Sequence, residues 1–229
     1  MSYPNNGGKP IFNEFITPIG LIVHASHDRP LLKTNEQTKA PILDAQGMQE
    51  AEFRVTLAWE KARIAELQPL INLAKQTQEE AWPGSTVPGA FFALEPFFRD
   101  GDSPAHNTKK REYLFGKYYL NFKQKAIASR NPTTQQVVYS GAPGLLGPYG
   151  EDIMPLDLYS GCTGRVSGIL FGSEYMGRNF ISSRLNNIQK FEDGERIGGG
   201  ARPDPKSQFT PLKAGGNPAG AQAGMRDIL

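Results

Sequence analysis

The residues that best define a ligand are concentrated in one stretch, KKREYLFGKYYLNFKQKAIASR, at positions 109–130. It holds seven Lys and Arg residues against one acid, Glu112, which gives a net charge of +6. The whole chain has 25 basic and 23 acidic residues, a net charge of +2, so the remainder sums to −4. Positive charge is therefore segregated into this segment, which favours an anionic partner.

Aromatic residues alternate with the charges in the same segment. At the two-residue period of a β-strand, one face is apolar and suits a barrel interior: Leu114, Gly116, Tyr118, Leu120 and Phe122. The other face carries rings and ammonium groups: Tyr113, Phe115, Lys117, Tyr119, Asn121, Lys123 and Lys125. Exposed aromatic rings are unfavourable in water, so we expect something to cover this second face.

Single-stranded nucleic acid has the chemistry that fits both groups on that face. Unpaired bases stack on aromatic rings for about 1–3 kcal/mol per base, while cations follow the phosphates. We predict base stacking on three rings: Tyr113, Phe115 and Tyr119. We predict phosphate contacts by six cations: Lys109, Lys110, Arg111, Lys117, Lys123 and Lys125. The alternative is a structural face covered by the Phe-rich segment 91–98, with solvated lysines at its rim.

Other groups of residues resemble metal, phosphate-binding or catalytic sites, but each lacks residues that such a site requires. His24 and His27 have a metal-ligand spacing, yet no cysteine pair or second histidine pair completes a tetrahedral set. The glycine-rich stretch 144–150 lacks the Lys-Ser/Thr of a phosphate-binding loop. No catalytic Lys or His stands at a diagnostic spacing from three nearby acids: Glu151, Asp152 and Asp157. Cys162 has no base beside it in the sequence. We therefore expect no metal, no cofactor and no catalytic residue.

The elements that must position the basic segment are mostly strands. Residues 51–59 alternate between apolar and polar side chains and predict a half-buried strand, whose buried face holds Phe53, Val55, Leu57 and Trp59. A helical period follows over 60–81, where Pro69 predicts a kink or two shorter helices. Further strands are predicted at 17–25, 112–126, 135–140 and 157–171. This mainly β (α+β) pattern is compatible with an OB-fold, a five-stranded Greek-key barrel with elaborated loops, although composition also allows a sandwich.

Composition bounds the class of protein. The 229 residues include 25 Gly and 18 Pro, a surplus that favours a loop-rich β protein over a helical bundle. We predict one domain over 1–200, with a mobile arm at 1–10, followed by a flexible tail over 201–229. A single cysteine fits a reducing cytoplasm. Because no signal peptide or long apolar run is visible, we expect no membrane association.

The second half of the chain carries an ordered set of short motifs. Tyr159-Ser-Gly-Cys162 leads into a strand, a segment from Gly177 to Gln189 follows, and Asp193-Gly-Glu195 with two glycines closes the set. In the first half, three further stretches agree: Thr17-Pro18, FRVTL at 53–57 and Asp100-Gly-Asp102. The order and spacing resemble a family of bacteriophage single-stranded-DNA-binding proteins over roughly residues 15–200. In that pattern Leu185-x-x-Ile188-Gln189 implies a helix and Asp193-Gly194 a turn.

The resemblance implies an OB-fold that coats single strands during phage DNA replication, recombination and repair, largely without sequence preference and without catalysis. It places the protein in the cytoplasm of the infected bacterial host. Three arginines of the matched region join the candidate DNA contacts: Arg165, Arg178 and Arg184. Binding of RNA, or weakly of duplex DNA, stays open, as does the choice between a monomer and a homodimer.

The tail is where this sequence departs from the resemblance. Related proteins commonly end in an acidic tail that docks on replication proteins, whereas residues 201–229 have a net side-chain charge of +2. Docking of replication proteins through the tail is therefore a weaker expectation than DNA binding. The alternative function is a phage structural or assembly protein that uses the aromatic and basic face as a protein interface. Salt-sensitive binding of oligonucleotides distinguishes the two.

Overall fold

The computed structural model describes residues 12–84, 97–175 and 178–197. The expected N-terminal arm, the C-terminal tail, and Phe91 and Phe92 of the Phe-rich segment lie outside these residues. The predicted division of the chain at residue 200 therefore stays a prediction. In the described ranges, no helix has both the length and the apolar character needed to cross a membrane.

Three strands open the fold: β1 (Asn13–Ile16), β2 (Gly20–Leu32) and β3 (Ala51–Glu60). The core face predicted for β3 is confirmed, because its four large apolar side chains are at most 1% exposed. The prediction of a half-buried strand is wrong, because Glu52 and Thr56 on the other face are buried as well. β2 and β3 pair antiparallel, with Leu21 opposite Ala58 and Ile22 opposite Leu57. A register shift after Ile22 turns both Val23 and His24 away from the core, because the extra residue interrupts the alternation.

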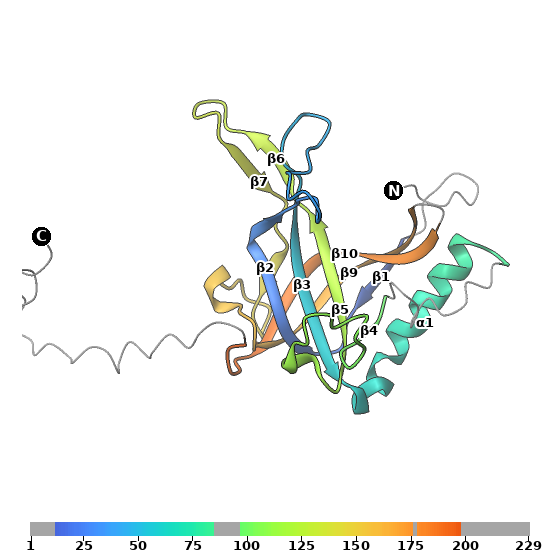
Figure 1. Cartoon of the computed structure of the whole chain (residues 1–229). Helices are drawn as coiled ribbons and strands as arrows, with labels where there is room; N and C mark the ends of the chain where they lie inside the picture. Colours follow the sequence, from blue (N-terminus) through green and yellow to red (C-terminus); the bar gives the residue numbers. More distant parts are fainter. Residues whose placement is uncertain (1–11, 85–96, 176–177, 198–229) are drawn as a thin grey trace, which may run out of the picture. The chain divides into compact units, whose positions relative to one another are not determined.

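Three further strands close the sheet into a barrel: β5 (Lys117–Lys125), β9 (Thr163–Tyr175) and β10 (Arg178–Glu192). The order around the barrel is β2-β3-β5-β10-β9, and β9 returns to pair with β2 (Figure 1). β5 and β10 are parallel, while the other four neighbouring pairs are antiparallel. The predicted five-stranded OB-fold barrel is confirmed, and the sandwich is not formed.

One helical segment joins β3 to β5, as the sequence predicts. A 3-10 turn, η1 (Lys61–Arg63), leads into α1 (Ile64–Ala81), which packs its buried face against β1, β9 and β10. Of the two outcomes expected at Pro69, the division into two shorter helices is wrong, because α1 continues through it, and the kink stays a prediction. Pro69 and Ala65, whose carbonyl loses its N–H partner, are both exposed, so water can satisfy that oxygen.

Shorter elements decorate the barrel: β4 (Arg99–Asp100), η2 (Glu112–Leu114), β6 (Ile127–Arg130), β7 (Val137–Ser140), β8 (Gly144–Leu146) and η3 (Pro155–Asp157). β6 and β7 form a separate hairpin that projects beside the loop between β2 and β3 (Figure 1). The Tyr139 hydroxyl of this hairpin donates to the backbone oxygen of Gln49 at 2.9 Å, which ties the two projections together.

The helix implied at 185–189 by the family pattern is wrong, since these residues lie within β10. Leu185 and Ile188 are both fully buried although they are three residues apart. A register shift between Leu185 and Asn187 inserts one extra residue into the strand. The bulge returns Ile188 to the core face. The spacing of three between Leu185 and Ile188, which is typical of a helix, therefore arises from an irregular strand.

The Tyr159-Ser-Gly-Cys162 motif and the segment 193–197 pack against each other. The Tyr159 hydroxyl donates to Asp193 Oδ1 at 2.8 Å, and the Ile197 amide donates to the Ser160 oxygen at 2.9 Å. Asp193-Gly194 is therefore no hairpin turn but the start of a returning segment. Gly161 permits this approach: it has φ +117°, and a Cβ there would lie 1.9 Å from the Glu195 oxygen.

Replacing Gly161 with Ala should destabilise the fold through both backbone strain and this clash. We expect Gly161→Ala to lower the free energy of unfolding by about 3 kcal/mol or more, measured by urea denaturation. Gly150→Ala is the matched control, because Gly150 has φ +86° with nothing within 4 Å of its added Cβ. That variant should lose only about 1 kcal/mol. Equal losses in the two variants would contradict the role of the close contact.

Candidate nucleic-acid interface

A loop over residues 101–116 folds onto the outer surface of β2, β3 and β5. Asn107, which is buried, holds it together: its Nδ2 donates to the backbone oxygens of Gly101 and Arg111, and its Oδ1 accepts from the Arg111 amide. Asp102 accepts from the Gly116 amide at 2.8 Å. The Lys61 ammonium bridges Asp100 and Asp102 at 2.7 Å each, and these hydrogen bonds raise the pKa of Lys61. The loop is therefore fixed at both of its ends.

The ring of Tyr119 lies beneath this loop. Tyr119 is on the outer face of β5, as predicted, but is only 5% exposed and packs with Val23, Ala58 and Leu114. Its hydroxyl donates to the His106 oxygen at 2.6 Å. The prediction that Tyr119 offers a free surface for stacking is wrong, because residues of its own chain cover the ring.

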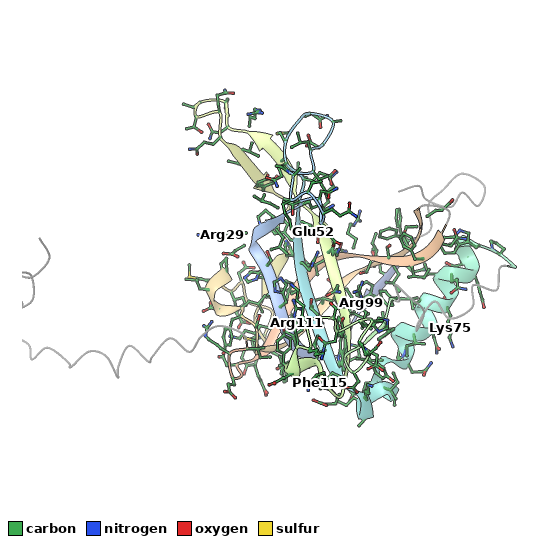
Figure 2. The ribbon with its side chains drawn as sticks, in the orientation of Figure 1. Arg29, Glu52, Lys75, Arg99, Arg111 and Phe115 are labelled. Atoms are coloured by element: carbon green, nitrogen blue, oxygen red, sulfur yellow. The ribbon has the colours of Figure 1, made fainter. Side chains whose placement is uncertain are left out.

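Tyr113 and Phe115 precede the strand instead of lying on it. Tyr113 belongs to η2, is half-buried and packs on the same cluster as Tyr119. Gly116 then turns the chain with φ +70°, and β5 begins only at Lys117. Phe115 is 47% exposed and lies at the end of the barrel opposite Glu52 (Figure 2). Of the three predicted stacking rings, Phe115 alone presents a largely open surface.

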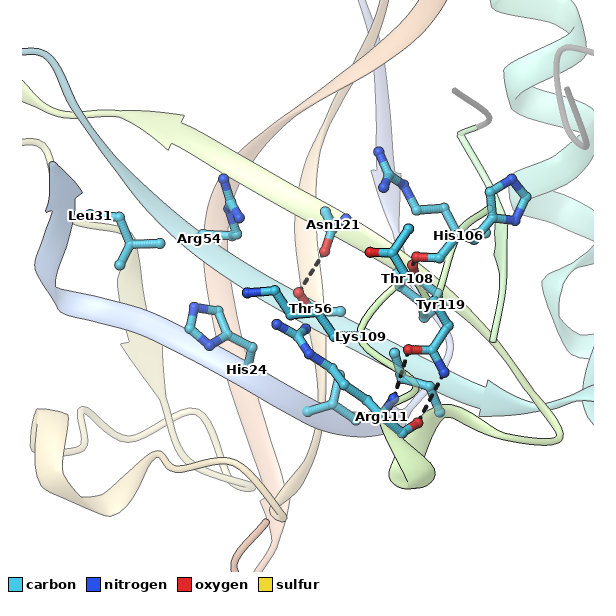
Figure 3. Close-up of a pocket in the computed structure, with 14 residues that line it drawn as sticks. His24, Leu31, Arg54, Thr56, His106, Thr108, Lys109, Arg111, Tyr119 and Asn121 are labelled. Atoms are coloured by element: carbon cyan, nitrogen blue, oxygen red, sulfur yellow. Dashed lines mark hydrogen bonds between the residues drawn. The ribbon is translucent and has the colours of Figure 1, made fainter. Parts of the chain in front are cut away.

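A recess of about 280 Å³ separates the loop from the strands (Figure 3). Four cations line it: Arg54 from β3, Arg99 from β4, and Lys109 and Arg111 from the loop. His24 and His106 also line it, and no lining residue is a carboxylate. Within the described residues, no acid lies within ion-pair distance of Arg99, Lys109 or Arg111. Arg54 pairs with Glu52, which does not line the recess, so the positive charge without an acidic partner among the described residues belongs to the other three cations.

The other end of the same face mixes both signs of charge. Glu52 is largely buried and pairs with Arg54, with Lys123 at 3.4 Å and with Lys33 at 3.9 Å. Burial acts to raise the pKa of Glu52, but Lys123, Arg54 and Lys33 together hold it below its usual value. Burial and the charge of Arg54 in turn lower the pKa of Lys123. The Glu52 carboxylate therefore holds these three cations in place and neutralises part of their positive charge.

The remaining predicted cations fall at different places. Lys110 is exposed beside Lys109, and Lys125 is exposed and pairs with Glu50 at 3.4 Å. Lys117 is mostly covered and pairs with Glu60 at 2.9 Å. Its charge therefore neutralises the carboxylate at the end of β3. Arg184 is exposed on β10 directly beside Lys123 and extends the basic face.

The sequence of this chain matches the model of one protein family, Enterobacter phage Enc34, ssDNA-binding protein, over residues 40–217. The chain belongs to this family. Its fold is similar to a solved structure titled as the single-stranded DNA-binding protein from bacteriophage Enc34 in complex with ssDNA. The identity is 16%, the TM-score is 0.53, and the match covers 81% of this chain and 89% of the other.

A second structure of the same phage protein matches with 15% identity and a TM-score of 0.54, covering 86% of this chain and 90% of the other. At these identities the similarity shows the fold of this Enc34-family chain. No curated protein matches its sequence.

Two further arginines are those carried by the family pattern. Arg165 is exposed on β9, donates to the Gln189 side chain at 2.8 Å and does not line the recess. Arg178 begins β10, where its backbone pairs with Tyr175.

The sequence analysis missed several residues that line this recess: His24, Arg54, Arg99, His106 and Asn107. They come from β2, β3, β4 and the loop, so only the fold brings them together. Arg54 did carry a signal, because it alternates with the buried residues of β3 and must point outward. The other four had no periodic pattern around them that identified the face.

The remaining sequence groupings take structural positions in this Enc34-family fold. His27 is buried and its Nε2 hydrogen-bonds the Pro155 oxygen at 2.8 Å. Asp157 accepts from the Met154 amide at the start of η3, and Glu151 accepts from the Tyr149 amide. Cys162 is fully buried. Across the described ranges, no three His, Cys, Asp or Glu side chains gather as metal ligands.

Tyr119 should behave as a core residue, although it lies outside the barrel. We expect Tyr119→Ala to lower the free energy of unfolding by about 3–5 kcal/mol, because it empties a buried site and leaves the His106 oxygen without a donor. Phe115→Ala, from the same segment, should cost about 1 kcal/mol or less since its ring is half exposed. Urea denaturation of both variants measures this, and similar losses would show that the assigned burial is wrong.

Proposed function

We propose that this chain binds single-stranded DNA along the outer face of β2, β3 and β5. The recess lined by Arg54, Arg99, Lys109 and Arg111, with no carboxylate among its lining residues, is the observation that carries the proposal. Phosphates are the anions that such a row of fixed cations attracts. Membership of a family described as ssDNA-binding proteins, and the fold it shares with a DNA-bound relative, support the same ligand.

The proposed mechanism divides the face into two zones with different tasks. Phosphates enter the recess, where Arg99, Lys109 and Arg111 have no acidic partner among the described residues to compete for them. Beyond it, Lys123, Lys125 and Arg184 guide the strand toward the mixed-charge end, where Glu52 limits the attraction. An exposed ring at Phe115 offers a base one stacking surface. None of these contacts reads a base edge, so the binding is largely independent of sequence.

This binding would serve phage DNA replication, recombination and repair by covering exposed single strands in the host cytoplasm. The role needs no chemical step, so we propose a non-enzymatic protein. The exposed ring of Phe115 stacks only with unpaired bases, so duplex DNA would bind more weakly than a single strand.

Removing two cations of the recess should weaken DNA binding without destabilising the fold. Lys109→Ala/Arg111→Ala should lower affinity for a labelled ~30-nucleotide single strand and reduce the slope of log K against log salt by about 1.4, or 0.7 per lost phosphate contact. Both side chains are exposed and have no acidic partner among the described residues, so stability should hold. Fluorescence anisotropy at several salt concentrations measures both quantities, with the matched duplex as a second ligand.

Arg165→Ala is the matched control, because it removes an exposed cation from β9, outside the recess. Its affinity and salt slope should stay close to those of the unaltered protein. Failure of the unaltered protein to bind at any salt concentration would refute DNA binding and favour a phage assembly protein whose basic face contacts another protein.

Phe115 should contribute to affinity through stacking. We expect Phe115→Ala to weaken single-strand binding by about 1–3 kcal/mol at constant salt slope, since a ring and no charge is lost. Tyr149→Ala is the control, because Tyr149 is 95% exposed on a loop that does not line the recess. Anisotropy titrations with the same oligonucleotide give both values. An unchanged affinity in Phe115→Ala would remove this ring from the binding surface.

A further inference from the structure

His24 is the one recess-lining side chain on β2 that can gain a charge near neutral pH. The register shift in β2 turns it outward, and in Figure 3 the side chains of Lys109 and Arg111 point toward it. It is half-buried between strand and loop, and its imidazole has no hydrogen-bond partner among the residues that the structure describes. The imidazole is therefore available to a ligand.

Cations lie close to His24 on two sides. Arg54 from β3 and Arg111 from the loop act on its charge, and Lys109 of the loop points toward it in Figure 3, while Arg99 and His106 line the same recess. No carboxylate lines the recess, and Glu52 on the same face already pairs with Arg54, Lys123 and Lys33. Partial burial, with Arg54 and Arg111 adding to it, lowers the pKa of His24. The free protein therefore holds this imidazole neutral at neutral pH.

A phosphate in the recess would reverse that balance. It would place negative charge among Arg54, Lys109, Arg111 and His24, cancel the repulsion that keeps the imidazole neutral, and accept a hydrogen bond from an imidazolium N–H. Because an opposite charge favours the charged form, the bound protein must hold the proton more tightly than the free protein. By linkage, a ligand whose binding takes up a proton binds more tightly as the pH falls.

We propose that the His24 end of the recess is a phosphodiester subsite and that His24 takes up one proton from solvent when a DNA phosphate enters it. The proposal rests on the DNA-binding function proposed above and adds a pH-sensitive contact to it. Other cations of the face keep their charge throughout, so His24 sets how affinity changes between pH 6 and pH 8.

Histidine NMR of the full chain tests the proton directly, because the protein has only three His residues. The signals are followed from pH 5 to pH 9, with and without an oligothymidylate of about 30 nucleotides, and His24→Gln identifies the His24 signal. We expect the pKa of His24 to rise by about one unit or more on binding. DNA binding that leaves this pKa unchanged would overturn the subsite and leave the proposed function standing.

Affinity provides the second readout. The unaltered protein should bind oligothymidylate about three- to tenfold more tightly at pH 6 than at pH 8, at fixed ionic strength. His24→Gln should bind with nearly the same affinity at both pH values, whereas His106→Gln should keep the difference. An unchanged pH ratio in His24→Gln would overturn the proposal. Absence of binding at both pH values would overturn this inference together with the DNA-binding function.

Discussion

The loop over residues 101–116 depends on one contact outside the barrel, the burial of Tyr119 beneath it. Ordering each loop residue costs about 1–2 kcal/mol of backbone entropy, so a long loop stays on a sheet only if it is anchored repeatedly. The Tyr119 ring and hydroxyl anchor its centre, Asn107 closes it on itself, and Lys61 fixes its start through Asp100 and Asp102. Lys109 and Arg111 project from this fixed frame. The recess therefore owes the two cations of its loop wall to Tyr119, a residue that the sequence assigned to base stacking.

Charge on this face is arranged in two ways that have different consequences. Glu52 is nearly buried, and an unpaired carboxylate at that depth would be costly, so Arg54, Lys123 and Lys33 are held around it. A phosphate arriving there must compete with an acid already in place. No carboxylate lines the recess, and among the described residues Lys109 and Arg111 have no acidic partner, although Arg54 pairs with Glu52. A polyanion is therefore attracted most strongly to the recess, where the cations of the loop are not neutralised by acidic side chains among the described residues.

How far the sequence predicts this structure depends on the range over which each signal acts. The core face of β3 was predicted correctly, because alternation along a strand is a local property. The burial of Glu52 and Thr56 on its other face was not predicted, since it depends on residues distant in the sequence. Tyr119 was placed on the correct face but taken as open, since nothing local reveals that a loop from the same chain covers it. Leu185 and Ile188 were misassigned to a helix because a bulge changes the strand period. Arg99 and His24 reach the recess through strand pairing across the sheet. Their spacing in the sequence does not predict this pairing.

The recess also bears on the choice between single-stranded and duplex DNA. Its walls are β2, β3 and β5 on one side and the anchored loop on the other, so a ligand must bring a phosphate in between them. A single strand rotates freely about its backbone bonds and can turn one phosphate inward while a neighbouring base meets Phe115. A duplex holds its phosphates on a stiff convex surface and its bases stacked inside, so it would meet only the outer cations. Preference for the single strand would then follow from the depth of the charged site as well as from stacking, and it would weaken if the loop lost its anchor on Tyr119.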